Sequence, residues 1–327
     1  MIHVLVLMGG NSAEREVSLR TGLEVSKSLK NLGFKVTKFD PSNEQLSQIQ
    51  VISPDIVFNA LHGRFGEDGF IQGLLETYKI PYTHSGVLAS ALAMDKFFSK
   101  KIFESVGIKC TSGDVFVLDD FLSNEVMDFP YVVKPINEGS SVGVNIIFNK
   151  EDKINFKNNN NWSFGKKILV EKYIPGKELT VAIFKDKAIG VTEIEYHSKV
   201  YDYHAKYQKN SSKHYIPANI STNKYNEALD IGIRAHRSLG CRGITRADIR
   251  YDSNSGLDEL YLMELNTQPG LTPISLFPEI ASYAGINFDE IVDWLIRDAG
   301  CNKWSTLSTL KYLKLEKFFF YGFCLLY

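Results

Sequence analysis

The sequence predicts an α/β protein, α+β overall, built from two or three packed domains. Its 327 residues are more than one hydrophobic core usually organises. Short apolar runs alternate with stretches of helical periodicity near the N-terminus, which is the pattern of an open α/β sheet. An apolar fraction of 44% and a charged fraction of 23% are ordinary for a globular chain.

Charge and cysteine content exclude several classes of protein. The net charge of -1 gives no general attraction to nucleic acid or to an anionic membrane, so we expect small-molecule partners. Cys110, Cys241, Cys301 and Cys324 lie far apart, which disfavours a disulfide framework and a structural zinc site. Because no secretion signal is visible, we expect reduced thiols in the cytoplasm.

The first 95 residues are expected to form an open α/β unit. The predicted elements are strands at 2–7, 35–39 and 55–61 and helices at 13–32 and 70–79. Ligands of such sheets bind at the carboxyl ends of the strands, where the turn at Gly9 and Gly10 and the residue His62 lie. The turn lacks the spacing of a dinucleotide site. Glu14 suits either a ligand amine or the helix dipole, and His62 suits either a structural hydrogen bond or a ligand.

The middle of the chain contains a candidate phosphate site. One helix is expected at 87–106, with Asp95 and Lys96 near its middle as a joint between domains. Residues 131–134 predict a strand that ends in Lys134, and a loop of small residues follows at 137–143. Backbone amides of such a loop can wrap phosphate oxygens, with Lys134 as the compensating charge. A flexible Gly/Ser hairpin is the alternative, and a Walker A loop is excluded by the spacing.

Residues 168–184 predict two strands around a turn and a candidate slot for a base. An apolar slot with a carboxylate at its mouth can read an adenine edge, and a second carboxylate can bind ribose hydroxyls. Glu171 and Glu178 suit these two roles. The tyrosine-rich segment 196–215 follows, and its length without regular structure indicates a lid.

The strongest candidate for a metal site lies near the end of the chain. The apolar run 260–263 predicts a strand, and period-2 alternation places Glu264 and Asn266 on one face at its end. Asp248, on the predicted strand 245–250, can supply a third oxygen ligand. Such ligands suit Mg²⁺, and phosphates and waters complete the coordination of this ion. The alternative is that these residues only cap strand ends at a solvated turn. Further helices are expected at 226–239 and 287–297.

Together these motifs resemble the D-alanine:D-alanine ligases of the ATP-grasp superfamily. The resemblance runs from about Val4 to Ile296. It rests on these motifs: Gly9-Gly10 with residues 11–18, Leu61-His62-Gly63 with Gly66-Glu67-Asp68-Gly69, Met94-Asp95-Lys96, Lys134-Pro135, residues 138–143, Tyr201-Asp202-Tyr203 with Ala205-Lys206-Tyr207, and residues 263–276. It implies a three-domain ATP-grasp architecture, with an N-terminal α/β domain at 1–95, a central subdomain at 96–183 and a C-terminal domain at 184–300 that includes the lid.

The resemblance implies ATP-dependent ligation of two D-alanine molecules through a D-alanyl phosphate, as in peptidoglycan precursor synthesis. ATP would lie between the central and C-terminal domains. Its implied contacts are Lys96, Lys134, Glu138, Ser141, Glu171, Ile174, Glu178 and Lys206. Asp248, Glu264 and Asn266 are the implied ligands of two Mg²⁺ or Mn²⁺ ions, which would offset charge on the transferring phosphoryl group.

The amino-acid site is likewise implied by the resemblance. Glu14 would pair with the ammonium of the first D-alanine, with His62 beside it. The remaining implied residues act on the second D-alanine: Glu14, Ser140 and Tyr207 near its amine, Arg246 and the Gly270 amide at the oxyanion, and Ser275 with the Leu276 amide at its carboxylate. The lid would exclude water from the acyl phosphate.

Two alternatives and one departure from the family pattern stay open. A D-alanine:D-lactate ligase shares most of these residues, although the pair Lys206-Tyr207 resembles the dipeptide-forming branch. A catalytically silent nucleotide-binding or scaffolding protein is the other alternative. Residues 301–327 extend past the point where compared members end, and we leave this tail unassigned. A homodimer is a family expectation only.

Overall fold

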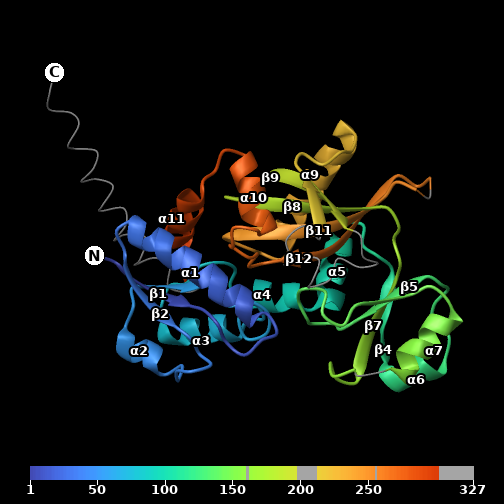
Figure 1. Ribbon diagram of the computed structural model, residues 1–327, viewed down its shortest axis with the longest axis horizontal. Helices are drawn as coiled ribbons and strands as arrows, with labels where there is room; N and C mark the ends of the chain where they lie inside the picture. The colour runs from blue at the N-terminus through green and yellow to red at the C-terminus, as the bar shows by residue number, and fades with distance from the viewer. Residues whose placement is uncertain (160–161, 197–211, 255, 302–327) are drawn as a thin grey trace.

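The computed structural model describes residues 1–159, 162–196, 212–254 and 256–301, which form three β-sheets flanked by helices (Figure 1). The N-terminal sheet is parallel and has the strand order β2-β1-β3. Its strands are β1 (His3–Leu7), β2 (Lys35–Phe39) and β3 (Ile56–Asn59). The predicted open α/β arrangement of this part of the chain is confirmed.

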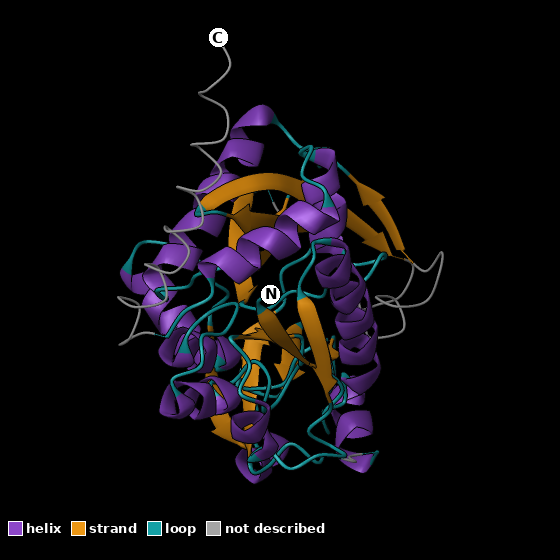
Figure 2. Ribbon diagram, turned by 90° about the vertical axis from the view of Figure 1, so that its left-hand side faces the viewer, coloured by secondary structure: helices purple, strands orange, loops and turns teal. Residues whose placement is uncertain are grey.

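Helices cover both faces of the N-terminal sheet (Figure 2). Val4 and Val6 of β1 enter one hydrophobic core, while the alternate residues Leu5 and Leu7 enter another. The helices around this sheet are α1 (Arg15–Asn31), α2 (Gln48–Ile52), α3 (Phe70–Tyr78) and α11 (Phe288–Asp298). Because β1 is buried on both sides, its side chains are apolar almost throughout, as expected for a parallel strand.

The segment predicted as one helix at 87–106 is two helices, α4 (Val87–Met94) and α5 (Lys96–Ser105). Asp95 separates them with an extended backbone, and its Oδ1 accepts hydrogen bonds from the amides of Phe97 and Phe98 at 3.1 and 3.0 Å. An aspartate in this role caps a new helix, which explains why the single-helix prediction was wrong. The break places Lys96 at the first position of α5.

A four-stranded antiparallel sheet follows, with the order β4-β7-β5-β6. Its elements are β4 (Gly113–Val117), α6 (Leu118–Ser123), β5 (Tyr131–Lys134), β6 (Asn145–Ile147), α7 (Lys150–Asn158) and β7 (Lys167–Lys172). This sheet has a small core of its own, built around Phe121, Tyr131 and Ile168. It lies apart from the N-terminal sheet in Figure 1, with α4 and α5 between them.

The largest sheet is antiparallel, with the order β10-β9-β8-β11-β12. Its strands are β8 (Lys177–Phe184), β9 (Lys187–Tyr196), β10 (Ser212–Tyr215), β11 (Ile244–Asp252) and β12 (Glu259–Asn266), and its helices are α9 (Thr222–Ser238) and α10 (Leu276–Tyr283). The predicted turn between two strands therefore links two different sheets. At that turn Gly176 has φ +96°, and an added Cβ would lie 2.2 Å from the Tyr251 carbonyl oxygen.

Part of the predicted lid, segment 196–215, forms a strand in the structure. Ser212–Tyr215 pairs with β9 as a strand, so this part of the segment expected to lack regular structure is ordered. Residues 197–211, with the predicted lid residues Lys206 and Tyr207, lie outside the described part of the chain. The chain passes from the four-stranded to the five-stranded sheet at the turn between β7 and β8, which precedes the predicted domain boundary at residue 183. The domain boundaries themselves remain a prediction.

The N-terminal and five-stranded sheets share one hydrophobic core. Val4 and Phe58 from the first sheet lie in the same buried cluster as Phe184 and Ile244 from the second. Near the end of the described chain, the Gly300 amide donates to the Tyr82 carbonyl at 3.2 Å, and Cys301 is buried. Residues 302–327 lie outside the description. No helix among the described residues is both long and apolar enough to cross a membrane.

Candidate active site

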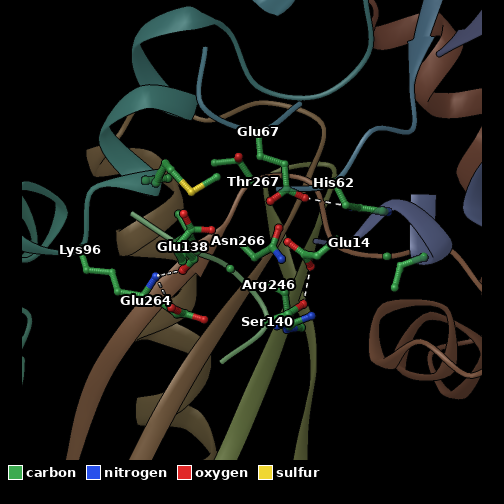
Figure 3. Close-up of a pocket in the computed structure, with 16 residues that line it drawn as sticks. Glu14, His62, Glu67, Lys96, Glu138, Ser140, Arg246, Glu264, Asn266 and Thr267 are labelled. Carbon is green, nitrogen blue, oxygen red and sulfur yellow. Dashed lines mark hydrogen bonds and ion pairs between the residues drawn. The ribbon is translucent and has the colours of Figure 1, made fainter. Parts of the chain in front are cut away.

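The register of β11 and β12 brings the predicted metal ligands together. Asp248 lies opposite Glu264, and Arg246 lies opposite Asn266. Glu264 and Asn266 are two residues apart on β12, and both face the cavity drawn in Figure 3. The predicted placement of these two side chains on one face is therefore confirmed.

Figure 3 shows this first cavity, which gathers residues from segments far apart in the sequence. It is bounded by the start of α1, the loop after β3, the start of α5, the loop after β5, and strands β11 and β12. Its lining includes the predicted residues Glu14, His62, Ser140, Arg246, Asn266 and Gly270. The set that the resemblance implied for amino-acid binding is thus largely collected in one place.

Glu14 is held at the centre of this cavity by its neighbours. Its carboxylate accepts a hydrogen bond from Ser140 Oγ and is 9% exposed. Cβ atoms added at Gly63 and Gly139 would lie 2.9 and 2.6 Å from Glu14 Oε2, so the absence of side chains there makes room for it. Ser140 has φ +50°, a strained conformation of the kind that gathers at functional sites.

His62 forms a buried pair with Glu67, a residue to which sequence reasoning gave no role. His62 Nδ1 lies 2.9 Å from Glu67 Oε1, and His62 Nε2 lies 3.1 Å from Thr21 Oγ1. Burial alone would lower the pKa of His62, but the hydrogen bond and charge of Glu67 outweigh it and raise that pKa. Burial raises the pKa of Glu67 to about 7, although His62 opposes the rise. The available signal was the position of Glu67 in the same loop as His62.

Lys96 contacts both the loop after β5 and the predicted metal ligand Glu264. Its Nζ donates to the Glu138 carbonyl oxygen at 2.6 Å and lies 3.2 Å from Glu264 Oε2. Burial raises the pKa of the Glu138 carboxyl, against the opposing charges of Arg64 and Lys96. The ammonium of Lys96 is therefore fixed beside two carboxyl-bearing residues at the start of α5.

A second cavity lies between the four-stranded and five-stranded sheets. It is lined by strands of both sheets and by the loop after β5. The predicted nucleotide residues in its wall are Lys96, Lys134, Glu138, Ser141, Ile174 and Glu178. Glu178 accepts a hydrogen bond from Tyr196 Oη at 2.9 Å and lies 3.4 Å from Arg250 Nη1, so its carboxylate is anchored within this wall.

The two cavities meet at shared residues. Lys96, Glu138 and Glu264 line both of them. Asp248 lines the second cavity and Asn266 the first, so the three predicted metal ligands span the junction. A group that is transferred between ligands in the two cavities would pass these side chains.

The donor set at the junction fits a magnesium ion that is held together with phosphate. The two carboxylates and one carboxamide are hard oxygen donors, and few protein ligands are typical where phosphates and waters complete the coordination. Asp248 also accepts hydrogen bonds from Thr180 Oγ1 at 2.7 Å and from Arg246 Nε at 2.9 Å. Among the described residues no group of three or more His, Cys, Asp and Glu side chains gathers as a complete metal cage.

Glu171 does not occupy the place expected for it. Its carboxylate is 1% exposed, does not line the second cavity, and lies between Lys100 and Lys134. The predicted placement of this carboxylate at the mouth of a slot is therefore wrong, whereas a role of Glu171 toward the adenine stays a prediction. The ion pairs with the two buried lysines compensate the charge of the carboxylate in this buried position. Sequence reasoning missed Lys100, whose spacing of four residues from Lys96 was the available signal.

The remaining predicted residues lie around the first cavity or outside the description. Ser275 and Leu276 do not line either cavity, but a Cβ added at Gly270 would lie 2.9 Å from Ser275 Oγ, so Ser275 is immediately behind that wall. Ser275 Oγ accepts a hydrogen bond from the Thr272 amide at 3.1 Å. Lys206 and Tyr207 belong to the segment that is not described.

Family models match most of the chain. The model described as "D-ala D-ala ligase C-terminus" matches residues 105–297, and the one described as "D-ala D-ala ligase N-terminus" matches residues 37–85. Among curated relatives, a D-alanine–D-alanine ligase from Parvibaculum lavamentivorans is 46% identical over 303 residues, which cover 92% of this chain and 98% of the relative. A ligase of the same name from Cereibacter sphaeroides is 48% identical over 301 residues, covering 92% and 97%.

Solved structures of similar chains agree with these matches. The D-alanine–D-alanine ligase from Bacillus anthracis complexed with ATP is 30% identical, has a TM-score of 0.77, and covers 96% of this chain and 99% of its own. The VanG D-Ala:D-Ser ligase from Enterococcus faecalis is 27% identical, with a TM-score of 0.75 and coverage of 90% and 98%. The mixed α/β fold of this chain is thus similar to that of ATP-dependent ligases.

Proposed function

The chain belongs to the D-alanine–D-alanine ligase family, and from this premise we propose how its two joined cavities divide the reaction between them. The enzyme catalyses the ATP-dependent ligation of two D-alanine molecules to D-alanyl-D-alanine, ADP and phosphate, which serves peptidoglycan synthesis. In our assignment the second cavity holds ATP and the first holds the amino acids. The observation that carries this assignment is the shared lining at Lys96, Glu138 and Glu264.

In the first step, a carboxylate oxygen of one D-alanine attacks the terminal phosphorus of ATP. A new O–P bond forms, the bond to the bridging oxygen breaks, and ADP leaves. Lys134 and Lys96 bind phosphate oxygens in this proposal, since both residues line the second cavity and carry a positive charge. Asp248, Glu264 and Asn266 would hold two Mg²⁺ or Mn²⁺ ions, which when bound offset the negative charge of the phosphates.

Glu14 and His62 position the first D-alanine in this proposal. The Glu14 carboxylate pairs with its ammonium group, which keeps that amine protonated and unreactive while the carboxylate is activated. His62, paired with Glu67, lies in the same wall of the cavity. The Glu14 carboxylate thereby favours a cationic end of the substrate at this position.

In the second step, the amine of the other D-alanine attacks the acyl phosphate. The amine first loses a proton, and the path we propose runs through Ser140 to Glu14, with Tyr207 completing the set by family resemblance. Attack forms a C–N bond and an oxyanion, which Arg246 and the Gly270 amide would stabilise; such donors contribute about 3–4 kcal/mol each. The intermediate then collapses as the C–O bond to phosphate breaks. Ser275 and the Leu276 amide are the proposed partners of the second carboxylate.

The cellular setting and assembly belong to the same proposal. We expect a cytoplasmic homodimer with the three-domain ATP-grasp arrangement, and the segment 196–215 acting as the lid that keeps water from the acyl phosphate. No contact with nucleic acid or membrane is needed for this chemistry. These expectations rest on family membership.

A screen of ADP release with Mg²⁺ and pairs of D-amino acids, L-amino acids and D-hydroxy acids tests the function directly. Two D-alanines should give the highest rate. A depsipeptide ligase would instead prefer D-lactate over D-alanine near neutral pH, and the D-Ala:D-Ser relative makes D-serine a necessary acceptor in the screen. Absence of ADP release with every pair would favour a silent nucleotide-binding protein, against which the intact set Arg246, Asp248, Glu264 and Asn266 speaks.

A further inference from the structure

Lys100 is a buried charged residue that the reaction described above does not use. It is 5% exposed, forms an ion pair with Glu171, and its Nζ donates to Thr111 Oγ1 at 2.6 Å. It lies on α5 four residues after Lys96, so one helix carries both lysines on neighbouring positions of one face. A buried ammonium needs such partners, because the loss of its hydration is otherwise uncompensated.

Glu171 is shared between Lys100 and a residue of the proposed nucleotide site. Its carboxylate also lies 2.7 Å from Lys134 Nζ, and Lys134 lines the second cavity whereas Lys100 and Glu171 do not. Two lysines and one glutamate leave one net positive charge. Because Lys100 is enclosed, the part of this charge that can face a ligand in the cavity is the ammonium of Lys134.

The Lys100–Glu171 pair also connects two parts of the fold. Phe103 of α5 lies in the same core as Ala247 and Leu262 of the five-stranded sheet. Glu171 is on β7 and Lys134 on β5, which both belong to the four-stranded sheet. The second cavity opens between these two sheets, so the pair crosses the boundary beside the cavity.

We propose that Lys100 is a positioning residue for the nucleotide: it neutralises Glu171, so that the Lys134 ammonium stays available to phosphate, and it fixes β5 and β7 relative to α5. The proposal rests on the proposed function in placing ATP in the second cavity. Without Lys100, Glu171 would be left with Lys134 as its only buried partner among these three. The ion pair would then cancel the charge that the nucleotide needs.

The ionisation of the cluster agrees with this arrangement. Burial lowers the pKa of Lys100 to about 8, although Glu171 on β7 raises it and Lys134 on β5 lowers it further; the Cys110 thiol is the other titratable group beside it. The Lys100 and Lys134 ammonium groups hold the pKa of Glu171 at about 2 despite its burial. At neutral pH the cluster therefore contains a charged Lys100 and an ionised Glu171.

The test uses Lys100→Met in the full-length enzyme, with Lys101→Met as the matched control. Lys101 is the next residue on α5, but its side chain is 56% exposed and lies 3.5 Å from Glu104. Mg²⁺-ADP binding by calorimetry and steady-state kinetics are the readouts. Lys100→Met should raise the Kd for ADP and the KM for ATP by roughly tenfold, the loss expected for one charge-assisted contact, with a much smaller change in kcat and in the KM for D-alanine. Lys101→Met should match the wild type.

A double variant separates electrostatic positioning from packing. Adding Glu171→Gln to Lys100→Met removes the charge that would otherwise neutralise Lys134, so ADP affinity should return most of the way to the wild-type value. A double variant that binds ADP no better than Lys100→Met would overturn the proposal, as would a Lys100→Met enzyme with wild-type ADP affinity. Should Lys100→Met fail to fold, the double variant decides: with both buried charges removed it should bind Mg²⁺-ADP close to the wild-type affinity, and an affinity roughly tenfold weaker would reject the proposal.

Failure of the proposal is distinguishable from failure of the proposed function. If the wild type releases no ADP with D-alanine but the ADP-binding pattern of the variants is as expected, the function is wrong and the role of Lys100 in nucleotide binding stands. If the wild type is an active ligase and the variants bind ADP normally, only the role of Lys100 is wrong.

Discussion

The carboxylate of Glu14 accepts a hydrogen bond from the hydroxyl of Ser140, across 126 positions of sequence. One residue begins the first helix of the N-terminal unit, and the other belongs to the loop that follows β5. The bond joins the first cavity to the loop that also lines the second cavity. The Glu14 carboxylate could not keep this place if Gly63 or Gly139 carried a side chain, because an added Cβ would lie 2.9 or 2.6 Å from its Oε2.

Removing the Ser140 hydroxyl should impair turnover more than stability. Ser140→Ala deletes one hydrogen bond to a charged group, worth about 1.5–3 kcal/mol, so kcat/KM for D-alanine should fall roughly 10- to 100-fold. ATP binding should change little, because Ser140 does not line the second cavity. Steady-state kinetics and ADP calorimetry measure both effects; an equal loss of ADP affinity would contradict the assignment.

Glu264→Gln should keep the fold and lose turnover through weaker metal binding. The Mg²⁺ concentration for half-maximal activity should rise at least ~10-fold, a typical effect of a changed metal-site residue. Glu259→Gln is a suitable control, because Glu259 starts the same strand but pairs with Lys109 away from both cavities. Activity near that of the wild type at limiting Mg²⁺ would remove Glu264 from the metal site.

The His62–Glu67 pair predicts a pH-dependent stability. Both pKa values are raised on folding, so both groups stabilise the folded protein at low pH, and this contribution is lost as the pH rises through the raised values, about 7 for Glu67. Glu67→Gln removes one titrating group and the main cause of the raised His62 pKa. The wild type should therefore lose its stability advantage over the variant between about pH 5 and pH 8.

Denaturant unfolding without ligands checks this expectation. The difference in free energy of unfolding between wild type and Glu67→Gln is compared at the two pH values. A difference that stays constant, or that grows with pH, would mean that the pair does not titrate as the geometry indicates.

Tyr207→Phe tests a proposed catalytic residue that lies outside the described part of the chain. If Tyr207 acts on the amine of the second D-alanine, the variant should still bind ATP and form the acyl phosphate. Hydroxylamine can trap that intermediate, so hydroxamate formation should persist while dipeptide formation falls. Parallel losses in both products would dismiss a role confined to the second step.

Removal of residues 302–327 should leave turnover unchanged, because the family match ends at residue 297. The cut should follow Cys301, because this residue is buried and its Sγ lies 3.3 Å from the Ile80 carbonyl oxygen. A cut after Ala299 also removes the bond between Gly300 and Tyr82 and should lower the melting temperature. Lower turnover after the shorter deletion would assign the tail a function.

Much of the fold was predictable because periodicity is local. The alternation that placed Glu264 and Asn266 on one face needs only the strand that contains them, and β2 and β5 begin and end where the sequence indicates. The split at Asp95 was missed because an aspartate can cap a helix or lie on its surface, and the backbone decides between these. The strand β10 was missed because its partner β9 supplies the pairing.

The site was predictable where a motif carries the chemistry and unpredictable where a contact crosses between segments. Glu14 and Ser140 were expected to lie together on family grounds, and they do. The predicted position of the Glu171 side chain was wrong because its neighbours are Lys100 of α5 and Lys134 of β5, which are distant from it in the sequence. Its burial under two ammonium groups depends on the packing of α5 against the four-stranded sheet, which no local pattern reveals.

The separate core of the four-stranded sheet has a consequence for the two ligand sites. The N-terminal and five-stranded sheets are joined by common buried side chains and by Gln268, whose Oε1 accepts a hydrogen bond from Asn59 Nδ2 at 2.9 Å. The four-stranded sheet keeps a core of its own, and the bond between Ser140 and Glu14 ties the loop after β5 to this joined unit. The same loop lines both cavities, so any displacement of the four-stranded sheet would reshape the two ligand sites together.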